Sequence, residues 1–267
     1  MSIATAVREG SAVAWADRRR RAADLVARQP YAAEVLSLYG ALLDVQERAA
    51  AAALESPPTR DGLVAFVVAR SLPGVMDVTT AAGTEYLREA SLLAFHEREP
   101  EAIIADWLAG AEQSPTDRYL ARAATEPVLE TLPQLAPATD GATDSKRCPS
   151  CGGLPQLGYV PNSGEALLTA PRHLLCSRCG TSWKFPRLTC AACGETETAR
   201  LPIYRATEQL PHLRVDACET CARYLITVEL GKEPAAVPVV DELAALPLDL
   251  DAKERGLTKV TPNLMGF

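Results

Sequence analysis

The spacing of apolar and polar positions divides the chain into a helical first half and a second half of short strands. From Tyr31 to Leu54, apolar residues recur at the spacing of an amphipathic helix, and Ser56-Pro57-Pro58 ends that pattern. A short apolar run over residues 63–69 follows, with Asp61 as its expected cap. The first 135 residues therefore predict an all-helical domain, with further helices over residues 84–96, 101–108 and 116–132.

The pattern changes after this domain. Residues 136–146 are rich in Pro, Ala, Thr, Asp and Gly, which is typical of a linker. The C-terminal tail, residues 231–267, carries one helical pattern between Asp241 and Arg255, in which Pro247 would kink the helix or delay its start. The expected fold class is α+β, and the region between linker and tail should form short β-hairpins, with strands near residues 156–160, 201–204 and 224–230.

All eight cysteines lie in this strand-rich region, as four Cys-x-x-Cys pairs. Each cysteine of the first two pairs recurs 42 residues later in the last two pairs. The region is therefore a tandem repeat of one small unit, over residues 147–188 and 189–230. The four pairs are Cys148/Cys151, Cys176/Cys179, Cys190/Cys193 and Cys218/Cys221.

The spacing within each pair favours metal binding. One tight turn can direct two sulfurs at a common point, and two such turns can form a tetrahedral cage. Glycine follows the second cysteine in three pairs and can adopt the left-handed backbone of such a turn, whereas Ala222 follows in the fourth, where we expect strain or a different backbone. We therefore predict two four-cysteine metal sites, one per repeat: Cys148, Cys151, Cys176 and Cys179, and Cys190, Cys193, Cys218 and Cys221.

The pattern leaves some alternatives open. The second and third pairs could instead bind metal across the repeats, or some pairs could be free thiols or a redox dithiol. Sulfur-only cages suit zinc or rubredoxin-type iron, and spacing does not choose between them. Four thiolates leave no position for substrate or water, and we find no catalytic constellation, so we expect no enzymatic activity. Of the three histidines, His96, His173 and His212, the last two lie near cysteines but break the 42-residue register, so they are not expected as ligands.

Charge bears on the choice of partner. The formal net charge is −7, and the run Arg18 to Arg21 is expected to be a solvated helix face, with a patch for an acidic partner as the alternative. Residues 146–225 carry a formal +4, which two dianionic metal sites would bring to about zero. A nucleic-acid-binding zinc ribbon usually keeps a basic face, so we expect no nucleic-acid partner. No 18-residue apolar run or targeting signal is visible, so we expect no membrane span and a cytoplasmic location with reduced thiols.

Five segments carry a resemblance to a known family. Three surround cysteines of the first three pairs: Cys148-Pro-Ser-Cys-Gly152, Leu174-Leu-Cys-Ser-Arg-Cys-Gly-Thr-Ser-Trp183 and Arg187-Leu-Thr-Cys-Ala-Ala-Cys-Gly194. The other two are residues 216–225 around the last pair and residues 239–250. Together they resemble the formate dehydrogenase accessory proteins of the FdhE type. The helical half matches more loosely, through residues 20–25 and 39–48.

The resemblance implies a tandem rubredoxin-like or zinc-ribbon domain that holds two metal ions, iron rather than zinc, at the eight cysteines. It also implies a cytoplasmic assembly factor that binds the catalytic subunit of formate dehydrogenase during maturation. A zinc-ribbon nucleic-acid-binding or regulatory protein is the alternative. Arg178, Trp183 and Arg187 lie near the cysteine turns and are candidates for client contact, although Trp183 could simply cover a metal cage. The sequence leaves open the redox activity of the metal and the oligomeric state, a homo-oligomer included.

Overall fold

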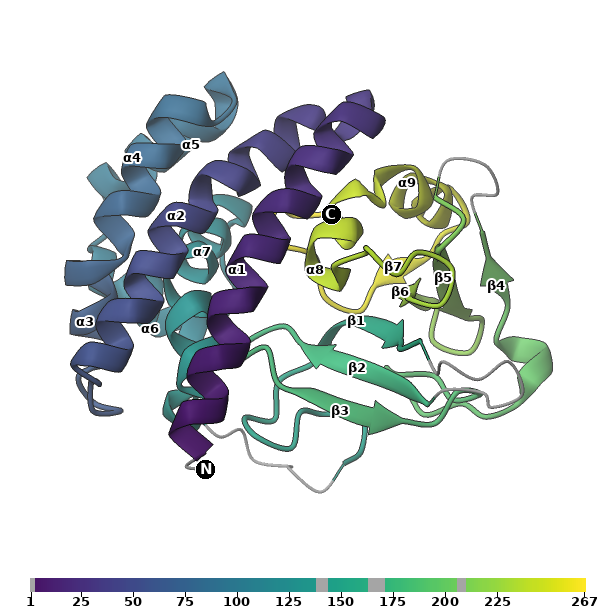
Figure 1. Ribbon diagram of the computed structural model, residues 1–267. Coiled ribbons are helices and arrows are strands. Elements are labelled where there is room, and N and C mark those ends of the chain that lie inside the picture. Colours follow the sequence, from purple (N-terminus) through teal and green to yellow (C-terminus); the bar gives the residue numbers. More distant parts are fainter. Residues whose placement is uncertain (1–2, 138–143, 163–170, 206–209) are drawn as a thin grey trace. The chain divides into compact units, whose positions relative to one another are not determined.

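The computed structural model describes residues 3–137, 144–162, 171–205 and 210–267 (Figure 1). Side chains are described from residue 15 onward. The chain forms two compact units, Met1–Ala138 with Gly266 and Thr139–Met265 with Phe267. Most of the expected linker, residues 136–146, lies outside the described residues, and the expected domain boundaries stay predictions.

The first unit is helical, as the sequence predicts. Its described residues form α1 (Ile3–Arg28), α2 (Ala33–Glu55), α3 (Leu63–Arg70), α4 (Leu72–Ala82), α5 (Glu85–Glu97), α6 (Pro100–Ala109) and α7 (Pro115–Thr131). The periodic segments correspond to α2, α3, α5, α6 and α7. Only the Arg18 to Arg21 stretch of α1 was expected to be helical, and α4 was not predicted as an element. No single helix in the described part of the chain is long and apolar enough to cross a membrane, although the bent pair α3–α4 passes on length and composition together.

Side chains cap two of these helices. The hydroxyls of Thr84 and Ser114 accept hydrogen bonds from the backbone N–H groups of the first turns of α5 and α7. The expectation that Asp61 caps α3 was wrong. Gly62 is the residue before that helix and provides no side-chain cap, and its own N–H donates to the Thr59 hydroxyl at 3.1 Å.

The arginine run is largely engaged within the helical unit. Arg18 on α1 donates two hydrogen bonds of 3.0 Å to Glu130 on α7, and Arg19 pairs with Asp44 and Glu47 on α2. Arg21 is buried and pairs with a carboxylate one helical turn along. The run therefore ties α1 to its neighbours, and the expectation of a wholly solvated face was wrong.

The second unit is built on one sheet. Its strands are β1 (Pro155–Val160), β2 (Arg172–Cys176), β3 (Ser182–Phe185), β4 (Ile203–Tyr204), β5 (Leu213–Cys218), β6 (Arg223–Glu229) and β7 (Thr258–Lys259). Their order is β3-β2-β1-β6-β5-β4, with β7 paired to β6 (Figure 1). The two expected sets of hairpins are thus not separate: β1 of the first repeat runs parallel to β6 of the second and joins them.

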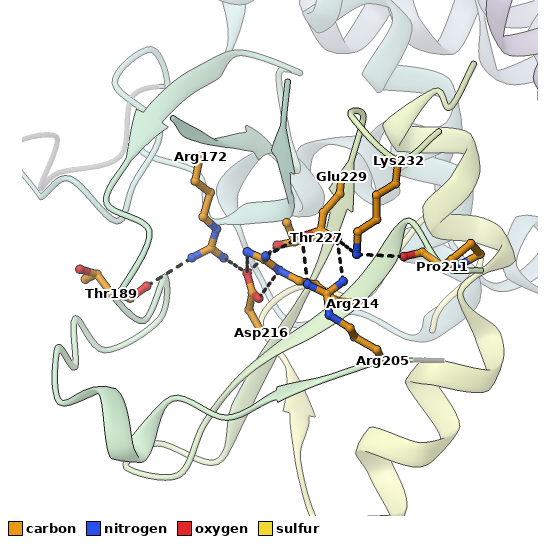
Figure 2. Close-up of polar contacts among 9 residues, drawn as sticks. All are labelled: Arg172, Thr189, Arg205, Pro211, Arg214, Asp216, Thr227, Glu229 and Lys232. Carbon is orange, nitrogen blue, oxygen red and sulfur yellow. Dashed lines mark hydrogen bonds and ion pairs between the residues drawn. The ribbon is translucent and has the colours of Figure 1, made fainter. Parts of the chain in front are cut away.

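A buried ionic network crosses this join (Figure 2). Arg172 on β2 reaches over β1 and β6 to Asp216 on β5, with 3.0 Å between its Nη2 and the carboxylate. The Thr227 hydroxyl donates to the same carboxylate at 2.7 Å. A Cβ at Gly158 on β1 would lie 2.6 Å from the Thr227 hydroxyl and 3.1 Å from Arg172 Nε, so only glycine leaves room for this crossing.

The network continues toward the end of β6. Arg214 links Asp216 to Glu229, with a hydrogen bond of 2.8 Å to each, and Arg205 and Lys232 also pair with Glu229 (Figure 2). Burial alone would raise the pKa of Glu229, but hydrogen bonds from Arg205 and Lys232 and the charge of Arg214 outweigh it and lower the pKa to about 2. Glu229 is therefore ionised at neutral pH.

The C-terminal segment completes the core of the second unit. It contains α8 (Pro238–Asp241) and α9 (Leu246–Glu254), and Pro247 lies in the first turn of α9, so the proline delays the helix rather than kinking it. Leu248 and Ala252 pack in one cluster with buried residues of β5 and β6. Lys259 is buried between Glu242, 2.8 Å away, and Asp249, 3.2 Å away. The expected tail is thus a structural layer on the sheet.

We expect Gly158→Ala to destabilise the second unit by about 1–3 kcal/mol, because the added methyl overpacks the crossing of Arg172 over β1. Hydrogen exchange of the β1 and β6 amides would measure the loss. Gly231→Ala is the matched control, because nothing lies within 4 Å of its added Cβ. Equal protection in the two variants would contradict the close packing at Gly158.

Candidate metal centres

Each cysteine pair lies in a tight turn whose backbone recurs in the two repeats. In the first repeat, Gly152 N–H donates to the Cys148 carbonyl at 2.8 Å. In the second, Gly194 N–H donates to the Cys190 carbonyl at 3.0 Å. The residue after each second cysteine has positive φ: 69° at Gly152, 64° at Gly180, 85° at Gly194 and 53° at Ala222. The fourth turn thus has the same backbone conformation as the other three. Of the two expectations for Ala222, strain is therefore the one that fits, because a left-handed backbone is unfavourable for alanine.

The turns bring the eight sulfurs together in two groups, as the 42-residue repeat predicts. Cys148, Cys151, Cys176 and Cys179 form one group, and Cys190, Cys193, Cys218 and Cys221 form the other, with the ligand atoms of each group within 4.8 Å of one another. The second and third pairs belong to different groups, so the expected alternative of ligation across the repeats does not fit this arrangement.

The distances between sulfurs fit a tetrahedral metal site. A metal 2.3 Å from four tetrahedral sulfurs separates them by about 3.8 Å. The structure places Cys148 3.7 Å from Cys179 and Cys151 3.5 Å from Cys176. The corresponding distances in the second group are 3.8 Å and 3.7 Å. These sulfurs are too far apart for disulfides, which need about 2.05 Å, and they could hold a metal ion.

Backbone N–H groups also point at the sulfurs. Arg178 N–H donates to Cys176 Sγ at 3.4 Å, and Ala192 N–H donates to Cys190 Sγ at 3.3 Å. Such bonds stabilise thiolate over thiol, which is the form that binds metal. Hydrogen bonds among the cysteines of the first group lower the pKa of Cys148 to about 7 and raise the pKa of Cys151 and of Cys176. In the second group, burial raises the pKa of Cys221. A backbone N–H donor points at one sulfur in each group.

The histidines take no part in either group. His212 is buried and lies 2.7 Å from an oxygen of Asp241, and the His173 ring stacks on Tyr159. A tetrahedral ion held by four cysteines would have no open position for either ring. The expectation that neither is a ligand fits this placement.

The three candidate contact residues lie in different surroundings. Trp183 is partly buried, packs beside Leu174 and Phe185, and donates its indole N–H to the Ser145 carbonyl at 2.9 Å. Arg187 lines a cavity of about 40 Å³ next to Cys190. The aliphatic stem of Arg178 lies over Gly153, where an added Cβ would be 3.1 Å from its Cδ.

Most of the second unit matches two families of known domains. The family models of the FdhE central domain and the FdhE C-terminal domain match residues 147–187 and 188–265, so between them they cover both cysteine groups and the C-terminal layer. From residue 147 to residue 265, the chain belongs to the FdhE family. The two models meet between residues 187 and 188, in the segment that separates the repeats.

Relatives in the FdhE family match over different lengths. An FdhE homologue of Aquifex aeolicus is 26% identical over 195 residues, 72% of this chain and 68% of that protein. An FdhE homologue of Pseudomonas putida is 34% identical over 135 residues, 49% of this chain and 41% of that protein. The crystal structure of the FdhE protein from Pseudomonas aeruginosa covers 94% of this chain and 95% of that chain, with a TM-score of 0.66 and 23% identity, and so shares the fold.

We expect Ala222→Gly to stabilise the second repeat by about 0.5–1 kcal/mol, because it relieves a left-handed backbone at an exposed position and removes no buried methyl. Gly194→Ala in the same repeat should lower the free energy of unfolding by about 1 kcal/mol, because φ at this position is 85°. The added Cβ itself has room, since the nearest atom would be 3.6 Å away. The midpoint of unfolding of β5 and β6, followed by hydrogen exchange in denaturant, compares the two. A loss of stability in Ala222→Gly would show that the turn is unstrained.

Loss of one cysteine should loosen its own repeat. In Cys176→Ser we expect faster hydrogen exchange across β1, β2 and β3 while the helices α1–α7 keep their protection, because metal binding stabilises a unit this small. The equivalent variant Cys218→Ser should affect β5 and β6 first. Unchanged protection of β1–β3 in Cys176→Ser would show that this sulfur is dispensable.

Proposed function

We propose that this protein is an accessory factor for formate dehydrogenase, which binds the catalytic subunit of that enzyme during its maturation in the cytoplasm. Membership of the FdhE family supports this proposal, with both four-cysteine groups present at the positions that the family resemblance implies. The proposal includes two bound metal ions, one per group, with iron or zinc as the metal. Elemental analysis of protein purified without oxygen identifies the metal.

The proposed role is binding rather than catalysis. A metal held by four cysteines has a filled tetrahedral shell, so substrate and water find no place on it. Such an ion can stabilise the fold or carry electrons. The residues of this chain would then act by shaping a surface that the client recognises.

The nucleic-acid alternative has less support. Four of the basic residues in the second unit are used in the ionic network around Asp216 and Glu229: Arg172, Arg205, Arg214 and Lys232. A DNA-binding titration at two salt concentrations separates the two functions, because binding through phosphate contacts weakens steeply with salt. Tight, salt-sensitive DNA binding without binding of the formate dehydrogenase subunit would overturn the proposal.

Binding of the formate dehydrogenase catalytic subunit, measured by titration, tests the contact surface. We expect Arg187→Ala to weaken binding about tenfold or more, because arginine beside a cavity is a common interface anchor. Arg88→Ala, an exposed arginine on α5, is the charge-matched control and should bind normally. Both proteins must first be shown to keep two metals per chain. Full binding by Arg187→Ala would place the contact elsewhere.

Trp183 needs a different comparison, because it has a structural role as well. Trp183→Phe keeps an aromatic ring against Leu174 but removes the hydrogen bond to the Ser145 carbonyl. Trp183→Ala removes both. If binding is lost in Trp183→Ala and retained in Trp183→Phe at equal metal content, the ring is a contact or a support for one. If metal is lost with the ring, Trp183 is a cover for the first site.

A further inference from the structure

The two cysteine groups have the same ligands and the same spacing, but they differ in access. In the first group all four cysteines are buried, with exposed fractions of 0%, 1%, 2% and 1% for Cys148, Cys151, Cys176 and Cys179. In the second group Cys193 is exposed and Cys221 is half-buried. Because each residue of one repeat has a counterpart 42 positions away, the cause of this difference can be traced position by position.

The covers over the two groups are different. In the first repeat, the Arg178 stem packs on Gly153, and a Cβ at Gly153 would lie 3.0 Å from Cys176 Sγ. The counterparts of Gly153 and Arg178 are Glu195 and Thr220. In the second repeat, the short Thr220 side chain donates a hydrogen bond of 2.6 Å to the Glu195 carboxylate, and this contact is exposed. The second group thus has no long side chain in the position of Arg178.

The charges around the two groups also differ. In the turns of the first repeat, residues 146–153 and 176–181 hold Lys146, Arg147 and Arg178 and no acid. Lys146 also lies beside the second group, with its Nζ 3.6 Å from where a Cβ at Gly194 would be. The counterparts, residues 188–195 and 218–223, hold Glu195, Glu219 and Arg223, a formal −1. Four thiolates around a divalent ion carry −2. Nearby cations stabilise such a dianion, and nearby carboxylates destabilise it.

The first group is therefore closed, whereas the second is open at Cys193, beside Glu195 and Thr220. We propose that the second group, through Cys193, is an exchange site that releases and takes up its metal, while the first group keeps its metal permanently. With a metal bound, Cys193 would be the ligand that gives way to an incoming donor such as a chelator, and its freed thiolate would take up a proton from water. This inference rests on the metal-binding part of the proposed function and not on the client.

Metal release to a chromogenic chelator tests the proposal directly. Protein loaded with two Zn²⁺ per chain is mixed with the chelator in a stopped-flow instrument. We expect two phases of equal amplitude, one metal each, with rates that differ by about tenfold or more. Cys193→Ser should remove the fast phase, and its counterpart Cys151→Ser should remove the slow one. A single phase with both metals, loading of fewer than two metals, or loss of the fast phase in Cys151→Ser would each overturn the proposal.

Exchanging the covers provides a test with all eight cysteines intact. Glu195→Gly with Thr220→Arg gives the second group the residues of the first, and should slow the fast phase about tenfold. Gly153→Glu with Arg178→Thr makes the reverse change and should accelerate the slow phase. Unchanged rates in both double variants would overturn the role of these residues. Because no client is present, failure here is distinct from failure of subunit binding, which the titration measures.

Alkylation gives a readout that does not depend on release. Metal-loaded protein treated briefly with iodoacetamide and digested for mass spectrometry should carry label first on Cys193, because this residue is exposed while the cysteines of the first group are buried. Equal labelling of Cys151 and Cys193 would contradict the difference in access.

Discussion

Neither cysteine repeat is large enough to bury a core of its own, and this constraint governs the second unit. A segment of about 40 residues normally needs metals, disulfides or association to fold. Here each repeat has four converging sulfurs, and the two repeats share one sheet through the parallel pairing of β1 with β6. The C-terminal segment then covers part of that sheet, with Leu248 and Ala252 packed on β5 and β6. The four-cysteine turns, the sheet pairing and the C-terminal layer are therefore parts of one folding unit.

The ionic crossing at Arg172 shows how the two groups are mechanically connected. Its guanidinium pairs with Asp216, two residues before Cys218, and donates to the Thr189 carbonyl at 3.3 Å, next to Cys190. Arg172 itself lies on the strand that ends at Cys176. Burial of a charge is costly unless it is paired, so removal of either partner would leave an unpaired charge in the sheet. One side chain thus links ligand-bearing segments of both groups.

The sequence predicted the parts of this structure that depend on local spacing. The Cys-x-x-Cys turns and the pairing within each repeat follow from short-range geometry, and helices such as α2 follow from periodicity. The sequence did not predict the continuous sheet. Gly158 and Arg172 lie far along the chain from Thr227 and Asp216, and no sequence motif marks their contact. The Arg18–Arg21 run was misjudged for the same reason, since Glu130 is 112 positions from Arg18.

The difference in access between the two cysteine groups can nevertheless be traced in the sequence, when each residue of the first repeat is compared with its counterpart 42 positions later. Ligand identity and spacing fix where the sulfurs meet, and both repeats keep them. How readily a sulfur leaves the metal depends on what lies over it, and there Gly153 and Arg178 have Glu195 and Thr220 as counterparts. Two repeats can therefore differ in reactivity although their metal ligands are the same. The geometry of the turns determines where the four sulfurs meet, whereas access and charge determine how easily one thiolate leaves the metal. In this chain, that divergence separates a site suited to holding the fold together from one suited to exchange with an outside ligand.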